Sequence, residues 1–320
     1  MSGPRILIVR FSAIGDCVMA AWAVTAIRER HPDASIVWAA ETRCIPVIDT
    51  ERLADKVIEI PRERWKRRGL RGLFDSMRLY RSLRGYEFDL GLDFQGHSKT
   101  ALCLRLAGPT IRASARATDA FARCLNPIPK LNPPSPHEVD LNLALVRAKL
   151  GAVPTPERPI MPRPVSTDRL PSFDAGRLVT IQTGAGAADK VVPAPAWCAV
   201  ADELIGDGWT VATIGGPHDP RVPHPRVLDW VGRLDLAEAI SAITHSRLHL
   251  AGDTGTGHIA AAYGVPVISV FGPTPVERYR PWGGSGRVLT RGRSTDLVGA
   301  PDIVAAAHEI LSSSRAPCGS

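Results

Sequence analysis

A glycine-rich turn at residues 253–258 carries the side chains best suited to bind an anion in this sequence. The apolar run 248–251 before it is typical of a buried strand, and residues 259–264 after it are typical of a helix that ends at a glycine. At such a junction, unpaired backbone N–H groups and the positive end of the helix dipole stabilise a phosphate group. Asp253 would repel phosphate, so we expect it to accept hydrogen bonds from the turn or from a ligand hydroxyl, while His258 donates to the anion.

Two other interpretations of this turn are open. Strand–turn–helix units with glycines are common in α/β proteins, and many of them bind no phosphate. The letters Asp-Thr-Gly-Thr also match the catalytic loop of aspartic proteases, which are all-β proteins with two such aspartates side by side. This sequence has one copy, and an alanine-rich helix is expected directly after it, which argues against a protease.

Asp16 and Lys190 are the other candidates for chemistry, and each follows an expected strand. Gly15 allows a tight turn, and Asp16 then lies near the start of the next helix, where it either complements the helix dipole or acts as a general base. Lys190 ends a glycine-rich loop at 183–190 that lacks the spacing of a P-loop. Its ammonium group is either solvated or neutralises a diphosphate that faces a helix N-terminus.

We expect no metal centre, because the sequence contains no Asp-x-Asp and its nine histidines do not cluster with cysteines or carboxylates at ligand spacing. A diphosphate leaving group would then need fixed protein charges in place of a cation. The six cysteines are scattered without C-x-x-C spacing, which favours reduced thiols in a cytoplasm. Neither a signal peptide nor a membrane span is expected, since the longest apolar run, 259–271, is broken by Gly264 and Pro266.

Length and pattern indicate two α/β domains. The chain has 320 residues, and its 44% apolar content is enough for two cores. Strand-like runs occur at 5–10, 35–39, 57–60 and 88–92, with helical patterns at 17–30 and 141–150. After prolines recur through 153–171, strand-like runs return at 178–182, 210–214, 248–251 and 265–271, with helical patterns at 196–205, 236–244 and 303–311. Short apolar strands that alternate with helices predict parallel sheets.

The predicted organisation is an N-terminal domain at 1–160, a proline-rich linker at 161–175, a second domain at 176–300, and a final helix and tail at 301–320. Two doubly wound halves joined by a linker predict a cleft between them. Ligands of open α/β sheets bind beyond the carboxyl ends of the strands, and the glycine-rich turns named above fall at such ends.

A basic segment spans residues 62–84 and carries much of the net charge of +7. Its cationic residues are Arg62, Arg64, Lys66, Arg67, Arg68, Arg71, Arg78, Arg81 and Arg84. Apolar residues, with Trp65 and Phe74 among them, interleave with these charges. The segment is therefore a solvated face, a site for an anionic membrane or a phosphorylated lipid-linked acceptor, or a nucleic-acid surface.

Taken together, the turns resemble those of the family 9 glycosyltransferases, the ADP-heptose:lipopolysaccharide heptosyltransferases, over most of the chain. The matching stretches are Arg10-x-Ser12-x-Ile14-Gly15-Asp16, Asp93-Phe94-Gln95-Gly96, His137-Glu138-Val139 through Gly151, Gly252-Asp253-Thr254-Gly255-x-x-His258 and Phe271-Gly272-Pro273-Thr274. The sequence departs from the family pattern after the donor loop, where Lys190-Val191-Val192-Pro193 lacks a tryptophan. It departs again after Asp219, where prolines replace an expected helix.

The resemblance implies a GT-B fold, in which two Rossmann-like doubly wound domains face a cleft. It implies inverting, metal-independent transfer of heptose from ADP-heptose to a phosphorylated lipopolysaccharide inner-core acceptor, with no cofactor. By the resemblance, Asp16 is the general base and Lys190 acts on the leaving diphosphate. The donor-binding residues would be Thr183, Gly184, Asp219, Asp253, Thr254, Gly255, Thr256, Gly257 and His258. The acceptor-binding residues would be Ser12, Gly15, Gln95, Arg64, Lys66, Arg67 and Arg116.

The expected setting is a monomer in the cytoplasm, or peripheral on the cytoplasmic face of the inner membrane, with transient membrane contact. Two alternatives differ in substrate or in class. One is a glycosyltransferase that uses another nucleotide-sugar donor for a different surface glycan. The other is a nucleic-acid-binding protein that uses residues 62–84, although the sequence contains no recognisable nucleic-acid module.

Overall fold

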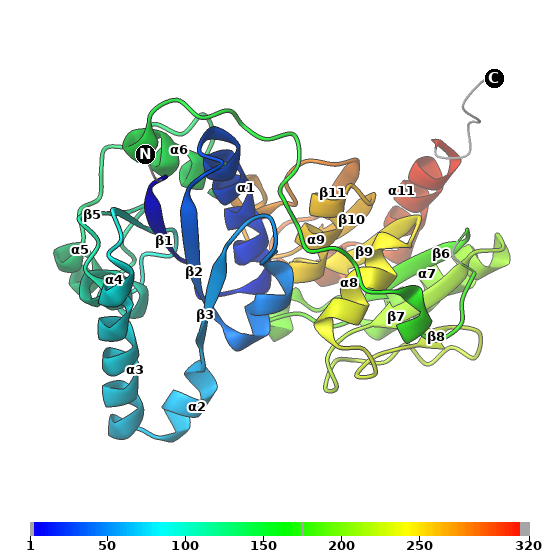
Figure 1. Ribbon diagram of the computed structural model, residues 1–320. Helices are drawn as coiled ribbons and strands as arrows, with labels where there is room; N and C mark the ends of the chain where they lie inside the picture. The colour runs from blue at the N-terminus through cyan, green and yellow to red at the C-terminus, as the bar shows by residue number, and fades with distance from the viewer. Residues whose placement is uncertain (1–2, 175, 314–320) are drawn as a thin grey trace. The chain divides into compact units, whose positions relative to one another are not determined.

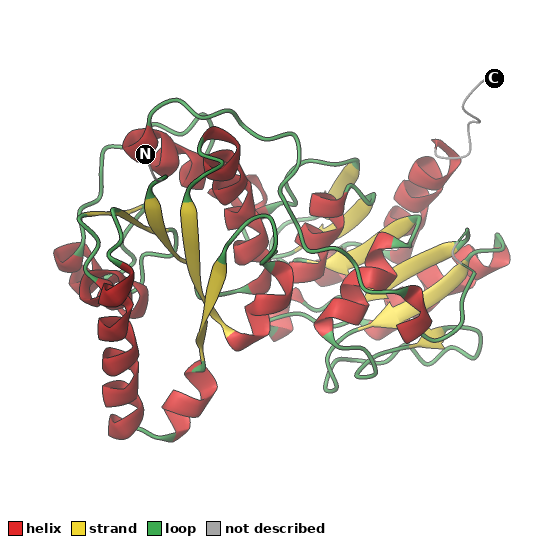
Figure 2. Ribbon diagram, in the orientation of Figure 1, coloured by secondary structure: helices red, strands yellow, loops and turns green. Residues whose placement is uncertain are grey.

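Two parallel sheets organise the chain, each inside its own compact unit (Figures 1 and 2). The computed structural model describes residues 3–174 and 176–313. Residue 175 of the expected linker and residues 314–320 of the expected tail, Cys318 among them, lie outside the described residues. Unit 1 covers residues 1–162 and unit 2 covers residues 163–320.

Unit 1 is a five-stranded parallel sheet with helices on both faces. Its strand order is β3-β2-β1-β4-β5, and the strands are β1 (Arg5–Val9), β2 (Ser35–Glu41), β3 (Lys56–Ile60), β4 (Leu90–Asp93) and β5 (Ile111–Ser114). The helices are α1 (Ile14–Arg30), α2 (Arg62–Arg67), α3 (Leu70–Ser82), α4 (Ser98–Ala107), α5 (Ala120–Leu125) and α6 (Glu138–Leu150). Helix α1 packs against α6, whereas α4 packs against α3 and α5 on the other face (Figure 1).

The order of the strands follows from the direction of their connections. The chain moves one way from β1 through β2 to β3, then returns to the other side of β1 with β4 and β5. Right-handed crossovers in opposite directions place their helices on opposite faces. Because both faces are covered, Leu7 and Val9 of β1 point into one apolar core with Tyr80 and Leu104, and Ile6 and Ile8 are equally buried.

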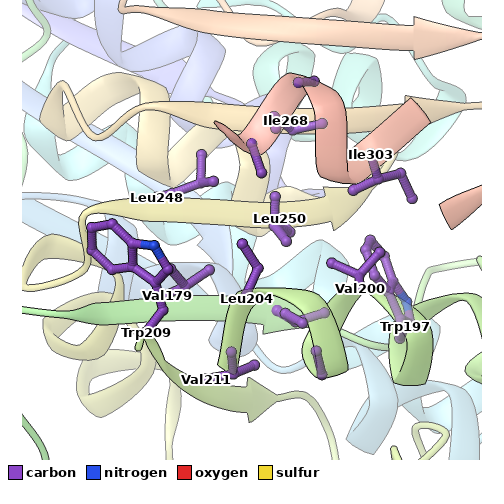
Figure 3. Close-up of a cluster of buried hydrophobic side chains, with 14 of the residues drawn as sticks. Val179, Trp197, Val200, Leu204, Trp209, Val211, Leu248, Leu250, Ile268 and Ile303 are labelled. Atoms are coloured by element: carbon purple, nitrogen blue, oxygen red, sulfur yellow. The ribbon is translucent and has the colours of Figure 1, made fainter. Parts of the chain in front are cut away.

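Unit 2 is a six-stranded parallel sheet in the order β11-β10-β9-β6-β7-β8. Its strands are β6 (Leu178–Gln182), β7 (Thr210–Ile214), β8 (Leu228–Asp229), β9 (Leu248–Gly252), β10 (Val267–Phe271) and β11 (Gly286–Thr290). Its helices are α7 (Ala194–Gly206), α8 (Leu236–Thr244), α9 (Gly255–Tyr263), α10 (Val276–Tyr279) and α11 (Ala300–Ser313). Figure 3 shows side chains of α7 and α11, such as Leu204 and Ile303, packed on Leu250 and Ile268 of the strands.

The structure confirms the predicted α/β class and most of the predicted elements. Helices α1 and α6 are among those that begin earlier than their apolar patterns indicate, and in these two a polar side chain caps the first turn. The Asp16 carboxylate accepts a hydrogen bond from the backbone N–H of Ala13 at 2.9 Å, and His137 Nδ1 accepts one from the backbone N–H of Val139 at 3.1 Å. The sequence patterns assigned no helix to α2, α3, α4, α5 or α10, and they missed the edge strands β5, β8 and β11.

Between α6 and β6, the described residues form only a short 3₁₀ turn at Thr167–Arg169, which agrees with the run of prolines there. Within residues 3–174 and 176–313, no helix is both long and apolar enough to cross a membrane.

Candidate active site

The carboxylate of Asp16 is held in place at the carboxyl edge of the unit 1 sheet. Its Oδ1 lies 2.6 Å from the Nη2 of Arg10, and its Oδ2 accepts the bond from Ala13 already described. Arg10 directly follows β1, and its Nη1 donates to the carbonyl oxygen of Phe94 at 2.7 Å. The Asp16 side chain keeps 24% of its surface exposed, so a ligand hydroxyl can reach it while its orientation stays fixed.

Asp93, at the end of β4, organises the neighbouring loop. Its Oδ1 accepts hydrogen bonds from the backbone N–H groups of Gln95 and Gly96 at 2.8 and 2.9 Å. Gln95 in turn accepts a bond from the N–H of Phe11 at 3.0 Å, which ties this loop to the one after β1. Complete burial raises the pKa of Asp93 to about 6, against the effect of the two backbone bonds. Gln95 therefore has a structural contact within unit 1 in addition to its predicted contact with the acceptor.

Ser12 leads to a second polar cluster, centred on the buried carboxylate of Glu41. Ser12 donates to Glu41 Oε1 at 3.3 Å, and Lys99 and Arg62 each place a nitrogen 3.1 Å from the same oxygen. Arg43 pairs with Glu41 Oε2 at 3.2 Å. Burial alone would raise the pKa of Glu41, but the hydrogen bonds and charges of Lys99, Arg62 and Arg43 outweigh it and hold this pKa below its ordinary value. Three cations around one carboxylate leave an excess of positive charge.

A cavity of about 180 Å³ opens beside this cluster. Arg62 and Lys99 line it together with the aromatic rings of Phe11, Trp65 and Tyr80. The Trp65 and Tyr80 rings meet edge to face, with centroids 6.0 Å apart. The cavity thus offers cations on one side and apolar rings on the other, which suits a small anionic group joined to a less polar body.

The remaining predicted acceptor residues of unit 1 differ in their surroundings. Arg64 and Arg67 are exposed on α2, and Lys66 is exposed but lies 2.8 Å from Glu63. Arg116 is largely enclosed and forms an ion pair with the buried Glu138 at the start of α6. The structure therefore gives Arg116 a role within unit 1, and its contact with an acceptor stays a prediction.

In unit 2, Lys190 and Asp253 form an ion pair at the head of α9. Lys190 Nζ lies 2.7 Å from Asp253 Oδ2, and the two side chains are 29% and 8% exposed. Gly252 makes this approach possible, because a Cβ at that position would lie 2.8 Å from the backbone oxygen of Lys190. The predicted lysine and the predicted turn, 63 residues apart in the sequence, thus meet at one place.

The turn after Asp253 leads into α9 as predicted. Thr254 occupies the N-cap position, where no side chain of the described residues caps the helix, and its hydroxyl lies 2.9 Å from that of Thr256. The backbone N–H groups of Gly255 and Thr256 belong to the first turn, which carries the positive end of the helix dipole. Gly257 is buried against Ser269 of β10, and His258 is 7% exposed.

Thr183, Gly184 and Asp219 form a third cluster at the carboxyl ends of β6 and β7. Asp219 accepts hydrogen bonds from Gln182 Nε2 at 3.0 Å and from the backbone N–H of Gly216 at 2.8 Å. A Cβ on Gly184 would lie 1.9 Å from the Asp219 carboxyl carbon, so only glycine leaves room for this carboxylate. The Thr183 hydroxyl is buried and has no hydrogen-bond partner among the described residues. A buried hydroxyl of this kind is suited to bind a ligand or a water molecule.

Comparison with known proteins decides the family of the chain. The sequence profile of glycosyltransferase family 9 (heptosyltransferase) matches residues 76–297. The chain belongs to glycosyltransferase family 9. It is 27% identical over 286 residues to lipopolysaccharide heptosyltransferase 1 of Pseudomonas aeruginosa, which covers 84% of this chain and 79% of the relative.

Two solved structures share the fold of this family 9 glycosyltransferase. A family 9 glycosyl transferase from Veillonella parvula superposes with a TM-score of 0.81 at 17% identity, over 98% of this chain and 99% of that one. An Escherichia coli heptosyltransferase solved with ADP-2-deoxy-2-fluoro heptose gives a TM-score of 0.78 at 21% identity, over 95% of this chain and 99% of that one. The likeness shows that the two Rossmann-like units form a GT-B fold, as the sequence resemblance predicted.

Several residues of this family 9 glycosyltransferase that shape the site were not assigned roles from the sequence. They are Arg10, which orients Asp16, Glu41, which accepts a hydrogen bond from Ser12, and Lys99, which pairs with Glu41. Their positions in the sequence could have identified them as candidate site residues. Arg10 and Glu41 lie at the carboxyl ends of β1 and β2, and Lys99 follows the loop after β4.

Proposed function

We propose that this glycosyltransferase moves heptose from ADP-heptose to a phosphorylated lipopolysaccharide inner-core acceptor, with inversion at the anomeric carbon and without a metal ion. The proposal is supported by the family, by the name of the Pseudomonas relative and by the heptose nucleotide analogue bound to the E. coli structure. The observation that carries it is the Lys190–Asp253 ion pair at the head of α9.

In the proposed donor site, different residues of unit 2 meet different parts of the nucleotide sugar. Lys190, His258 and the first-turn amides of α9 offset the charge that builds on the diphosphate as it leaves. Asp253 accepts a hydrogen bond from a sugar hydroxyl. Asp219 accepts one from the donor ribose, and the buried Thr183 hydroxyl binds a phosphate oxygen. These groups would supply the stabilisation that other transferases obtain from a cation.

In the proposed reaction, Asp16 is the general base. An acceptor hydroxyl attacks the anomeric carbon from the face opposite the diphosphate, and its proton passes to the Asp16 carboxylate. The bond from the anomeric carbon to the phosphate oxygen breaks, and the electron pair leaves with ADP. One carboxylate is enough, because the diphosphate leaves without a proton, unlike the alkoxide leaving groups of glycosidases.

In the proposed acceptor site, Ser12, Gly15 and Gln95 line the approach to Asp16. Cationic side chains of unit 1 bind the acidic groups of the acceptor. These side chains are Arg64, Lys66, Arg67 and Arg116, together with Arg62 and Lys99 of the Glu41 cluster. The excess positive charge around Glu41 and the cavity beside it support this assignment. We further propose that the protein works as a monomer in the cytoplasm, where the acceptor lies at the inner membrane.

A transfer assay with matched donors tests this proposal. The protein is incubated with a deacylated inner-core acceptor and ADP-heptose, and in parallel with ADP-glucose and UDP-glucose. We expect a heptose-sized mass increase of the acceptor with ADP-heptose alone, inverted anomeric configuration by NMR, and unchanged rates with EDTA. Transfer from another donor in preference to ADP-heptose would refute the donor assignment, and loss of activity with EDTA would refute metal independence.

A further inference from the structure

An exposed apolar stripe on α3 is the surface feature that the transfer reaction leaves unexplained. Leu70, Leu73 and Phe74 are 76%, 49% and 69% exposed, and they form a cluster within five consecutive positions. Leu73 also lines the cavity beside the Glu41 cluster, so Leu70 and Phe74 are the two side chains without a role in the proposed reaction. Large apolar side chains gathered in this way on a protein surface mark a site of interaction.

The packing of α3 explains why these side chains face outward. Gly72, Ser76 and Tyr80 recur at intervals of four residues and form the buried face of the helix. A Cβ at Gly72 would lie 2.0 Å from the backbone oxygen of Trp65, so α2 packs closely against this face. Leu70 and Phe74 are also four residues apart and lie on the opposite face. Their exposure is therefore built into a well-packed helix pair.

The charges around the stripe are almost all positive. Residues 62–82 carry eight cationic side chains and two acidic ones, which accounts for nearly all of the net charge of +7. Five arginines of this stretch are exposed and have no carboxylate at ion-pair distance among the described residues. They are Arg64, Arg67, Arg71, Arg78 and Arg81. Leucine and phenylalanine on one face of a helix, bordered by arginines, are the composition of a helix that lies in a membrane interface.

We propose that the α2–α3 pair (residues 62–82) docks on an anionic lipid bilayer, with Leu70 and Phe74 inserted among the acyl chains and the surrounding arginines on the headgroups. Charge complementarity selects this occupant, because a second copy of the chain would bring an equally positive surface against the first. Nucleic acid would meet the arginines but would offer no apolar phase to Leu70 and Phe74.

The position of the pair in unit 1 gives this docking a consequence. Helix α2 follows the carboxyl end of β3, so α2 and the N-terminal end of α3 lie beyond the strand ends (Figure 1). Asp16 and the Glu41 cluster occupy the same edge of the sheet. Docking through Leu70 and Phe74 therefore turns this edge of unit 1 toward the lipid headgroups.

Vesicle flotation with the full chain, in the absence of donor and acceptor, tests the proposal. We expect the protein to float with vesicles of phosphatidylcholine and phosphatidylglycerol, and to stay in solution with pure phosphatidylcholine. The double variant Leu70→Ser/Phe74→Ser should lose at least tenfold of its partitioning, because both apolar anchors are gone. The double variant Arg71→Gln/Arg78→Gln should partition about fivefold more weakly for each charge removed.

Matched controls come from exposed residues outside the pair. Phe121→Ser and Leu297→Ser remove apolar side chains that are 55% and 58% exposed, and Arg293→Gln removes an exposed charge. These variants should float like the wild type, and thermal unfolding should be unchanged in all of them. The proposal fails if the wild type ignores anionic vesicles, or if Leu70→Ser/Phe74→Ser floats as well as the wild type. It also fails if the wild type is a dimer in solution and Leu70→Ser/Phe74→Ser is a monomer, because the stripe would then bind a second copy of the chain. Because no substrate is present, the result is independent of the proposed transfer reaction.

Discussion

Lys190 Nζ lies 2.7 Å from Asp253 Oδ2, so the lysine proposed to receive a diphosphate is already bound to a carboxylate. A diphosphate and Asp253 must therefore share or compete for one ammonium group. The pair is partly exposed, and pairs of this kind contribute up to about 1 kcal/mol, which corresponds to about fivefold in affinity.

The variant Asp253→Asn should separate the two proposed roles of this residue. With the negative charge removed, ADP alone should bind about fivefold more tightly, because Lys190 is released and the repulsion of phosphate is lost. The proposed nucleotide-sugar donor should gain less or bind more weakly, since the sugar hydroxyl loses a charged acceptor. Isothermal titration calorimetry measures both affinities. Asp189→Asn, which removes an exposed charge from the same loop, should leave both unchanged, and equal changes for ADP and donor would contradict the sugar contact.

Asp16→Asn tests the proposed general base while it preserves the start of α1. The asparagine oxygen can still accept the hydrogen bond from Ala13, but the buried guanidinium of Arg10 loses its carboxylate partner, so the thermal unfolding midpoint should fall while the protein stays folded. The rate of transfer should fall by about 10²–10⁴-fold, since the amide cannot take a proton. Donor affinity should stay within twofold of wild type, because Asp16 belongs to unit 1 and the proposed donor residues to unit 2. Turnover within tenfold of wild type would show that another group is the base.

Gly184→Ala tests whether the packing of Asp219 matters for the donor. A Cβ at residue 184 would lie 1.9 Å from the Asp219 carboxyl carbon, so the carboxylate must leave its contacts with Gln182 and Gly216. The loss of these bonds should cost about 1–3 kcal/mol of stability and raise the donor KM at least tenfold, with little effect on kcat. Gly186→Ala, in the same loop and with nothing within 4 Å of the added Cβ, is the matched control. Similar kinetics for the two variants would remove Asp219 from the donor site.

The raised pKa of Asp93 leads us to expect that the stability of unit 1 depends on pH. Burial raises its pKa to about 6, above the ordinary value of 3.8, so the folded protein holds this proton more tightly than the unfolded chain does. The resulting stabilisation is complete below pH 3.8 and is lost as the pH rises through 6. Its size is about 3 kcal/mol, from about 1.4 kcal/mol per pH unit of pKa difference.

Asp93→Asn isolates this effect, because asparagine is neutral at every pH and can still accept the bonds from Gln95 and Gly96. Chemical denaturation between pH 4 and pH 7.5 should show the variant gaining stability relative to wild type as the pH rises. Asp33→Asn, an exposed carboxylate, should keep the wild-type slope. A constant difference between Asp93→Asn and wild type across this range would show that Asp93 has an ordinary pKa.

The local pattern of residues was sufficient to predict the α/β class and most strands, because burial on both faces of a parallel sheet produces short apolar runs. The runs at 178–182 and 210–214 coincide with β6 and β7 for this reason. The edge strands β5 and β11 were missed because solvent reaches them and polar residues interrupt their sequences. Asp16, Lys190 and Asp253 could be nominated as site residues because each lies shortly after a strand, where the next turn or helix begins.

Helix and strand periodicity act over a few residues, so local patterns could locate the candidate groups at the ends of strands. Which of these groups lie in contact depends on the folded arrangement of the strands. The order of the strands brings Lys190 to Asp253, gathers Lys99 and Arg62 on Glu41, and pairs Arg116 with Glu138. Contacts across dozens of residues depend on the close approach of backbones, such as the one that Gly252 permits beside Lys190, and no local pattern encodes that approach.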